Sequence, residues 1–220
     1  EKLACQTCHI PAMARGGIAT KMLWDWSQAG KMGPDGQPYV EKDASGHTIY
    51  DSKKGSFVVE ENVIPEYVWF NGRVKFSLIG DTINKEDEPV PINRFLGSPD
   101  DGKSRIWPVK VFKGIQPYDP VNKTLVMPKS YDSPGDDASY STHFDWHKAV
   151  SAGMAEVGAP FSGKVDFIMT QMLFPLTHMV APRGQTVACN ECHSSNGDLS
   201  IGRMKAVPGL KKRLRFRQEP

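Results

Sequence analysis

The chain has 220 residues, a formal net charge of +2, 39% hydrophobic residues and 24% charged residues, a composition typical of a globular protein. No apolar run reaches the ~18 residues that a membrane-spanning helix needs, and the near-neutral charge argues against nucleic acid as the main partner. Because no leader precedes Glu1, we expect that one has been removed or that the chain belongs to a longer protein.

The first 140 residues contain few helical signals. The run from Lys21 to Gln28 is apolar enough to predict a short helix, which Ala29-Gly30 ends. From there to about Tyr140 the sequence is rich in Gly, Pro, Asp and Ser, and we predict loops with short strands rather than a large sheet. The predicted strands are Phe57 to Val59, Tyr67 to Phe70, Val74 to Ile79, Ile106 to Phe112 and Leu125 to Met127.

The pattern becomes helical after Phe144. Trp146 to Val157 and Asp166 to Met179 are the predicted helices, and Pro175 must kink or shorten the second. The predicted fold class is therefore mainly α with long irregular loops and a few short strands, in a single domain over residues 1–220. Its parts are a first cysteine segment (1–30), a loop and short-strand insert (31–140), a helical segment (141–205) and a basic tail (206–220).

The cysteines carry the strongest signal. The segments CQTCH and CNECH are both C-x-x-C-H, the attachment signature of haem c, and together they use every cysteine of the chain. Each thiol adds to one vinyl group of the porphyrin, so the two must lie about one helical turn apart, and the adjacent histidine then faces the iron. The sequence predicts two covalent haems c, one on Cys5 and Cys8 with His9 as ligand, the other on Cys189 and Cys192 with His193 as ligand.

Two other interpretations of the cysteine pairs are weaker. A four-cysteine zinc site also uses paired C-x-x-C motifs, but it needs no histidine after each pair, and its halves would have to meet across roughly 180 residues. A thioredoxin-like redox pair requires a strand–helix context that neither segment shows.

We expect the second axial ligand of each iron to come from the remaining histidines. Iron with two histidine ligands has no open position, which favours electron transfer over substrate binding. We expect His178 to ligate the haem on the first cysteine pair. His143 and His147 are four residues apart and would share a helix face. Three roles are open for them: one of the two ligates the second haem, each faces a different iron, or both bind zinc together with a third ligand. His47, in a Gly- and Ser-bearing turn, is expected to ligate at most a haem of a neighbouring subunit, and Met179 is the alternative ligand to His178.

Several longer segments resemble the octahaem tetrathionate reductase family of multihaem cytochromes. They are CQTCHIP, KMLWDWSQAG, IWPVKVFKGIQPYDPVNKTL and THMVAP, which begin at Cys5, Lys21, Ile106 and Thr177. The resemblance covers most of the chain and matches the C-terminal part of those longer proteins, where the last two haems lie. It implies closely spaced, mainly bis-histidine haems, and supports His9, His193 and His178 as ligands. The catalytic haem of that family has a lysine ligand in a part without counterpart here, so the resemblance does not extend to reductase activity.

The predicted function is electron transfer by a dihaem c-type cytochrome, outside the cytoplasm because haem attachment takes place there. The expected partners are redox proteins and further copies of the chain, which would meet by haem contact or by donating a ligand, as in an extracellular haem wire. The alternatives are a haem reductase with five-coordinate iron, or the electron-entry module of a larger octahaem enzyme. The basic run from Lys211 to Arg217 is either a solvated tail or a docking site for an acidic partner.

Overall fold

The computed structural model describes residues 2–131, 137–192 and 202–208, so that His193 and the run from Lys211 to Arg217 lie outside the described residues. The elements are α1 (Cys5–His9), β1 (Thr20–Asp25), η1 (Trp26–Gln28), β2 (Val40–Lys42), β3 (Thr48–Asp51), β4 (Gly55–Glu60), β5 (Glu66–Phe70), β6 (Arg73–Phe76), β7 (Val90–Pro91), β8 (Asn93–Leu96), β9 (Arg105–Asp119), β10 (Thr124–Leu125), α2 (Tyr140–His143), α3 (Trp146–Glu156), β11 (Asp166–Pro175), η2 (Arg183–Gln185) and α4 (Cys189–Cys192).

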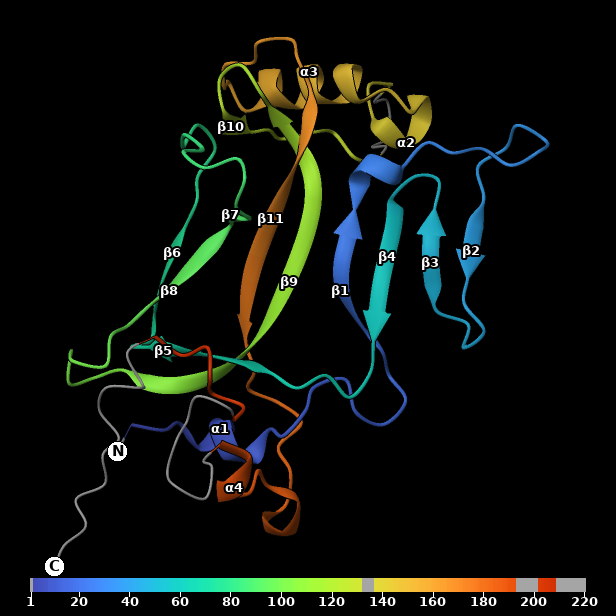
Figure 1. Cartoon of the computed structure of the whole chain (residues 1–220). Helices are drawn as coiled ribbons and strands as arrows, with labels where there is room; N and C mark the ends of the chain where they lie inside the picture. Colours follow the sequence, from blue (N-terminus) through green and yellow to red (C-terminus); the bar gives the residue numbers. More distant parts are fainter. Residues whose placement is uncertain (1, 132–136, 193–201, 209–220) are drawn as a thin grey trace, which may run out of the picture.

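The predicted fold class is wrong, because the structure is mixed and rich in strands (Figure 1). Nine strands form one sheet in the order β2-β3-β4-β1-β9-β11-β7, with β5 and β10 paired to β9, and β6 and β8 form a second, two-stranded sheet. The pairs β1–β9 and β11–β7 are parallel, and the other pairs are antiparallel. The strands expected at 57–59, 67–70 and 106–112 are confirmed within β4, β5 and β9, but they belong to a large sheet rather than to isolated runs between loops.

The pair β9 and β11 forms the centre of this sheet. The two strands pair antiparallel from Asp166 opposite Tyr118 to Pro175 opposite Val109, so the helix predicted from Asp166 to Met179 is wrong. By periodicity alone, an apolar run of this kind fits a buried helix or a strand with both faces covered. A continuous ladder of hydrogen bonds to β9, a partner distant in sequence, selects the strand here, because strand preference depends strongly on tertiary context.

The run from Lys21 to Gln28 is also a strand for most of its length, which corrects the second predicted helix. β1 lies between β4 and β9, and only the last three residues form the 3-10 turn η1. The Asp25 side chain begins that turn by accepting a hydrogen bond from the Ser27 N–H at 2.9 Å. Trp24 stacks on Trp26 with ring centroids 4.4 Å apart. Pairing along both edges and aromatic packing therefore hold this run in the sheet.

The helix predicted from Trp146 to Val157 is confirmed as α3. Its buried Val150 and Met154 lie in a small apolar cluster, and the helix approaches the chain after β10 closely. A Cβ atom at Gly153 would lie 1.9 Å from the Met127 carbonyl oxygen, so this contact requires glycine. Among the described residues, no helix is long and apolar enough to cross a membrane.

The 15-residue strand β9 is roughly 45 Å long along its curved course, and it connects the two ends of the sheet (Figure 1). Near its start, the Ile106 carbonyl accepts a hydrogen bond from the Ala4 N–H at 3.1 Å, which places α1 beside it. At its last residue, Asp119 accepts from the Ser162 N–H at 2.7 Å, in the loop after α3. Figure 1 shows α1 and α4 together at one end of the sheet and α2 and α3 at the opposite end. We call these the motif end (α1, α4) and the helix end (α2, α3).

Candidate functional site

The first cysteine segment is anchored to β9 through the residue before its second cysteine. Thr7 is fully buried, and its hydroxyl donates a 2.7 Å hydrogen bond to the Ile106 carbonyl, the same oxygen that accepts from the Ala4 N–H. This anchor turns the opposite side of α1 outward, so that Cys5 is exposed and Cys8 half-buried. Both thiols are thus held on one short helix, with Cys5 open to solvent.

The ring of His9 is oriented for binding a metal through one nitrogen. Its Nδ1 atom lies 3.1 Å from the Ala181 carbonyl oxygen. A carbonyl only accepts hydrogen bonds, so Nδ1 carries the proton and the Nε2 lone pair is left free. This is the usual arrangement of a metal-binding histidine, in which a backbone carbonyl fixes the tautomer and the ring angle.

The second cysteine segment, α4, is held by a residue at the same motif position as Thr7. Glu191 precedes the second cysteine, and its carboxylate accepts hydrogen bonds from the Ala188 N–H at 2.9 Å and from Arg203 Nε at 2.8 Å. These two contacts hold the pKa of Glu191 below its ordinary value. The chain after α4 folds back closely, because a Cβ atom at Gly202 would lie 2.5 Å from the Cys192 carbonyl oxygen.

The two cysteine segments meet although they stand at opposite ends of the described sequence. The Val187 N–H donates to the Cys8 carbonyl at 2.9 Å, and Arg203 reaches the Pro11 carbonyl at 2.5 Å. Burial, and next the neighbouring Cys8, raise the pKa of the Cys192 thiol. The separation of the two cysteine pairs in sequence is therefore no argument against a shared zinc site. In the described part of the chain, however, no three His, Cys, Asp or Glu side chains converge as a metal site.

The motif end contains buried polar atoms that lack a partner in the protein, and a haem has carboxylates that could bind such atoms. Among the described residues, the buried side-chain atoms without a hydrogen-bond partner are Arg15 Nε and the Tyr67 hydroxyl. Arg15 lies beside the first segment, where its guanidinium donates to the Met179 carbonyl. Burial raises the pKa of Tyr67, while the nearby Arg203 guanidinium acts in the opposite direction and Cys192 and Cys8 add smaller influences. Orphaned buried polar atoms are rare in native structures. Haem carries two carboxylates, which are groups of the kind that could accept from Arg15 Nε and the Tyr67 hydroxyl.

His178 lies at the motif end, in the segment that hydrogen-bonds to α1. Its side chain is exposed, and it stands three residues before Ala181, whose N–H also donates to the His9 carbonyl at 2.7 Å. The neighbouring Met179 has a left-handed backbone, φ +63°. The structure therefore places the segment that contains His178 beside the first cysteine segment.

The structure does not bring His143 or His147 to the cysteines. Both are exposed and lie at the helix end, with the length of β9 between them and the motif end (Figure 1). They do not share one helix either, because α2 ends at His143 and α3 begins at Trp146. His47 stands in the turn between β2 and β3, with its Nδ1 3.2 Å from an Asp43 carboxylate oxygen and its Nε2 on the side of Glu61.

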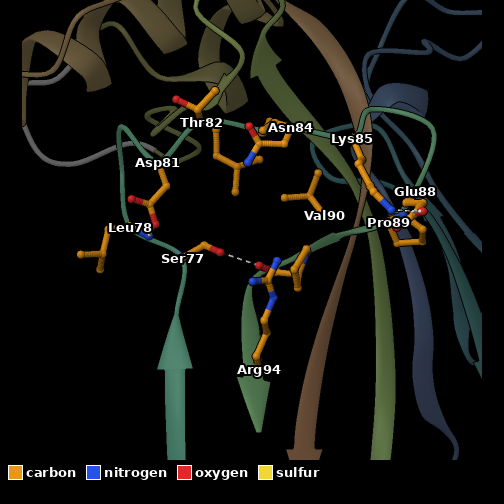
Figure 2. Close-up of a pocket in the computed structure, with 13 residues that line it drawn as sticks. Ser77, Leu78, Asp81, Thr82, Asn84, Lys85, Glu88, Pro89, Val90 and Arg94 are labelled. Carbon is orange, nitrogen blue, oxygen red and sulfur yellow. Dashed lines mark hydrogen bonds and ion pairs between the residues drawn. The ribbon is translucent and has the colours of Figure 1, made fainter. Parts of the chain in front are cut away.

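A pocket of about 300 Å³ lies away from the cysteine segments, between the β6–β8 sheet and β7 (Figure 2). Several of its polar side chains are engaged locally: the Ser77 hydroxyl donates to the Pro91 carbonyl at 2.6 Å, and Lys85 pairs with Glu88 at 2.7 Å. It contains no cysteine or histidine. The motif end is therefore the candidate functional site.

Paired thiols on short helices, each helix held by its third residue, together with a histidine whose Nε2 is free, define a c-type cytochrome. A family model described as bacterial cytochrome c matches residues 21–196, and the chain belongs to that family. The two cysteine pairs are consistent with two haems, and a redox or electron-transfer role follows from the class. Bacterial c-type cytochromes typically lie outside the cytoplasm.

A solved structure, the octaheme cytochrome c from Shewanella oneidensis, matches this chain over its whole length with a TM-score of 0.83 and 35% identity. The chain spans 48% of that protein. The match supports the predicted relationship to octahaem cytochromes, while the tetrathionate reductase relationship stays a prediction. No curated protein matches the chain.

Proposed function

We propose that the chain is a two-haem electron-transfer unit, in which the two haems lie next to each other at the motif end and both irons are six-coordinate and low-spin. The observation that supports this most directly is the contact between the two cysteine segments, through Val187 with Cys8 and through Arg203 with Pro11. Segments held this close attach two macrocycles as neighbours. The bound iron would supply one-electron redox chemistry.

The side chains of the motif end have positioning roles in this proposal. Thr7 and Glu191 hold the two attachment helices in place, and the Ala181 carbonyl holds the proton of His9 at Nδ1, away from the metal-binding atom. A histidine fixed in one tautomer and one orientation changes little between oxidation states. Such rigidity suits electron transfer, because no ligand has to move.

We further propose that His178 ligates an iron other than the one bound by His9. The Ala181 carbonyl occupies the side of the His9 ring opposite Nε2, so the segment with His178 lies behind this ligand. To reach the other face of the same macrocycle, the segment would have to pass around its edge. The proposal replaces the prediction from sequence, in which His178 ligates the haem on Cys5 and Cys8.

The test uses a one-haem chain in which Cys189 and Cys192 are both replaced by alanine. Adding His178→Ala to this chain should leave the spin state of the remaining haem unchanged in low-temperature EPR. Conversion of that haem from low-spin to high-spin would overturn the proposal about His178. For the native assembly of the two-haem chain, rapid carbon monoxide binding by the reduced protein would indicate an open iron and favour the reductase alternative over electron transfer.

A second proposal concerns assembly with other haem-bearing units. Together with His193 of the second motif, His9 and His178 make three histidines, whereas two six-coordinate irons need four ligands. His143 and His147 are exposed at the opposite end. Copies arranged head to tail would bring the helix end of one copy to the motif end of the next. As half the length of an octahaem relative, the chain also fits an electron-entry module of a longer protein.

Low-temperature EPR of the native assembly and of dissociated monomers tests this second proposal. If a neighbour supplies a ligand, a high-spin signal should appear only after dissociation, and the double variant His143→Ala/His147→Ala should show the same signal without dissociation. Low-spin signals alone in both states would contradict ligand donation between units.

A further inference from the structure

Arg203 connects the two cysteine segments, and neither segment's motif assigns it a role. Its Nε and Nη2 atoms donate to one carboxylate oxygen of Glu191, at 2.8 and 2.5 Å, and its Nη1 donates to the Pro11 carbonyl at 2.5 Å. Its own N–H donates to the Glu191 carbonyl at 3.0 Å. One guanidinium thus joins Glu191, inside the second C-x-x-C-H segment, to Pro11, two residues after the first segment ends.

This contact differs from an ordinary surface ion pair. The Arg203 side chain is only 16% exposed, and its planar fork supplies three donors to two different segments, which a lysine ammonium cannot reproduce with the same geometry. Exposed pairs contribute little, but a mostly buried arginine that bonds two segments restricts their relative position. The Tyr67 hydroxyl lies close to the Arg203 guanidinium but makes no hydrogen bond of normal geometry with it.

We propose that Arg203 is a positioning residue for the haem pair: with Glu191 it sets the spacing of the two haems and, by its charge, their reduction potentials. The inference rests on the proposed two-haem function. The physical argument has two separable parts. The hydrogen bonds fix the distance between the attachment segments, and the charges would act on the haems that these segments hold, because a mostly buried site is less polar than water.

The electrostatic part has a definite sign for each substitution. A positive charge beside a haem favours the reduced state, which carries one positive charge less, and a negative charge favours the oxidised state. Arg203→Gln should therefore lower the reduction potentials, and Glu191→Gln should raise them. A merely structural disturbance has no reason to move the two variants in opposite directions. Arg203→Lys keeps the charge but loses the fork, so its mean potential should stay near that of the wild type while the interaction between the haems changes.

The experiment is a spectroscopic redox titration of the haem-loaded protein, with EPR of each variant and Arg73→Gln, an exposed arginine on β6, as the control. We expect opposite shifts for Arg203→Gln and Glu191→Gln, no shift for the control, and an altered inter-haem EPR interaction in Arg203→Lys. Shifts of the same sign, or none beyond the control, would overturn the proposal even in a chain with two low-spin haems. A chain that attaches only one haem would instead overturn the proposed function.

Discussion

Replacing Thr7 by valine removes the hydroxyl that anchors the first attachment helix, with almost no change in shape. Thr7 is fully buried, and its 2.7 Å hydrogen bond goes to the Ile106 carbonyl. That oxygen keeps its second donor, the Ala4 N–H at 3.1 Å, so no acceptor is left unsatisfied. The expected loss is the net value of one hydrogen bond, about 1 kcal/mol. This corresponds to a decrease of about 2–4 °C in Tm for a chain of this size.

The assay is denaturant unfolding of the haem-loaded protein, followed by circular dichroism, with two companion variants. Thr7→Ser keeps the hydroxyl and loses one buried methyl group, which costs about 0.8 kcal/mol. Thr7→Ala loses both, so its loss should be close to the sum, about 2 kcal/mol. If Thr7→Val were as stable as the wild type while Thr7→Ser and Thr7→Ala were equally destabilised, the hydroxyl would contribute nothing and the anchoring argument would be refuted.

Three further predictions concern the same end of the molecule. Gly202→Ala should destabilise the chain by about 1–3 kcal/mol, because its Cβ would meet the Cys192 backbone; Gly184→Ala, in open space, should cost little in the same unfolding assay. Tyr67→Phe removes an orphaned buried hydroxyl, so it should stabilise the haem-free chain but not the loaded one if haem supplies the partner, as thermal unfolding of both forms would show. Since hydrogen bonds lower the folded-state pKa of Glu191, its stabilisation is present above the unfolded value of about 4.3 and is lost as the pH falls through the lowered value. Glu191→Gln should therefore flatten the acid side of the stability–pH curve, and an unchanged curve would contradict this.

The chemistry of the site could be predicted from the sequence because it depends on a local pattern. The spacing within each C-x-x-C-H segment requires only one helical turn, and the turn at Cys5–His9 is present as α1. The predicted pairing of His178 with the haem on Cys5 and Cys8 stays a prediction, although the segment that contains His178 does lie beside the first cysteine segment. The contact between the two segments was not predicted, because it depends on the packing of chain ends that are distant in sequence.

The sheet could not be predicted because its defining pairings are non-local. The sequences of β11 and β1 predict helices when taken alone, since their apolar residues are not separated by turn signals. Pairing with β9, and of β1 also with β4, makes them strands. The short runs in the insert were recognised by their β-branched and aromatic residues. Their assembly around β9 has no local signal in a single sequence.

Two of the residues that sequence analysis missed lie in the variable positions of the motifs, and a third lies outside them. Thr7 and Glu191 each precede a second cysteine, where the motif allows any residue, and Arg203 stands outside both motifs. A signal existed for Glu191, since an acidic residue in the first turn of a helix accepts backbone N–H bonds. The helical spacing of His143 and His147 was misleading, because Phe144 adopts a left-handed conformation that ends α2 between them.

The central claim, that two haems lie next to each other at the motif end, is tested most directly by EPR during a redox titration of the haem-loaded monomer. Neighbouring paramagnetic irons interact, so the spectrum of the haem that stays oxidised should change when the other is reduced, and the fully oxidised spectrum should not be the sum of two independent signals. Two low-spin signals that titrate without influencing one another would contradict the account.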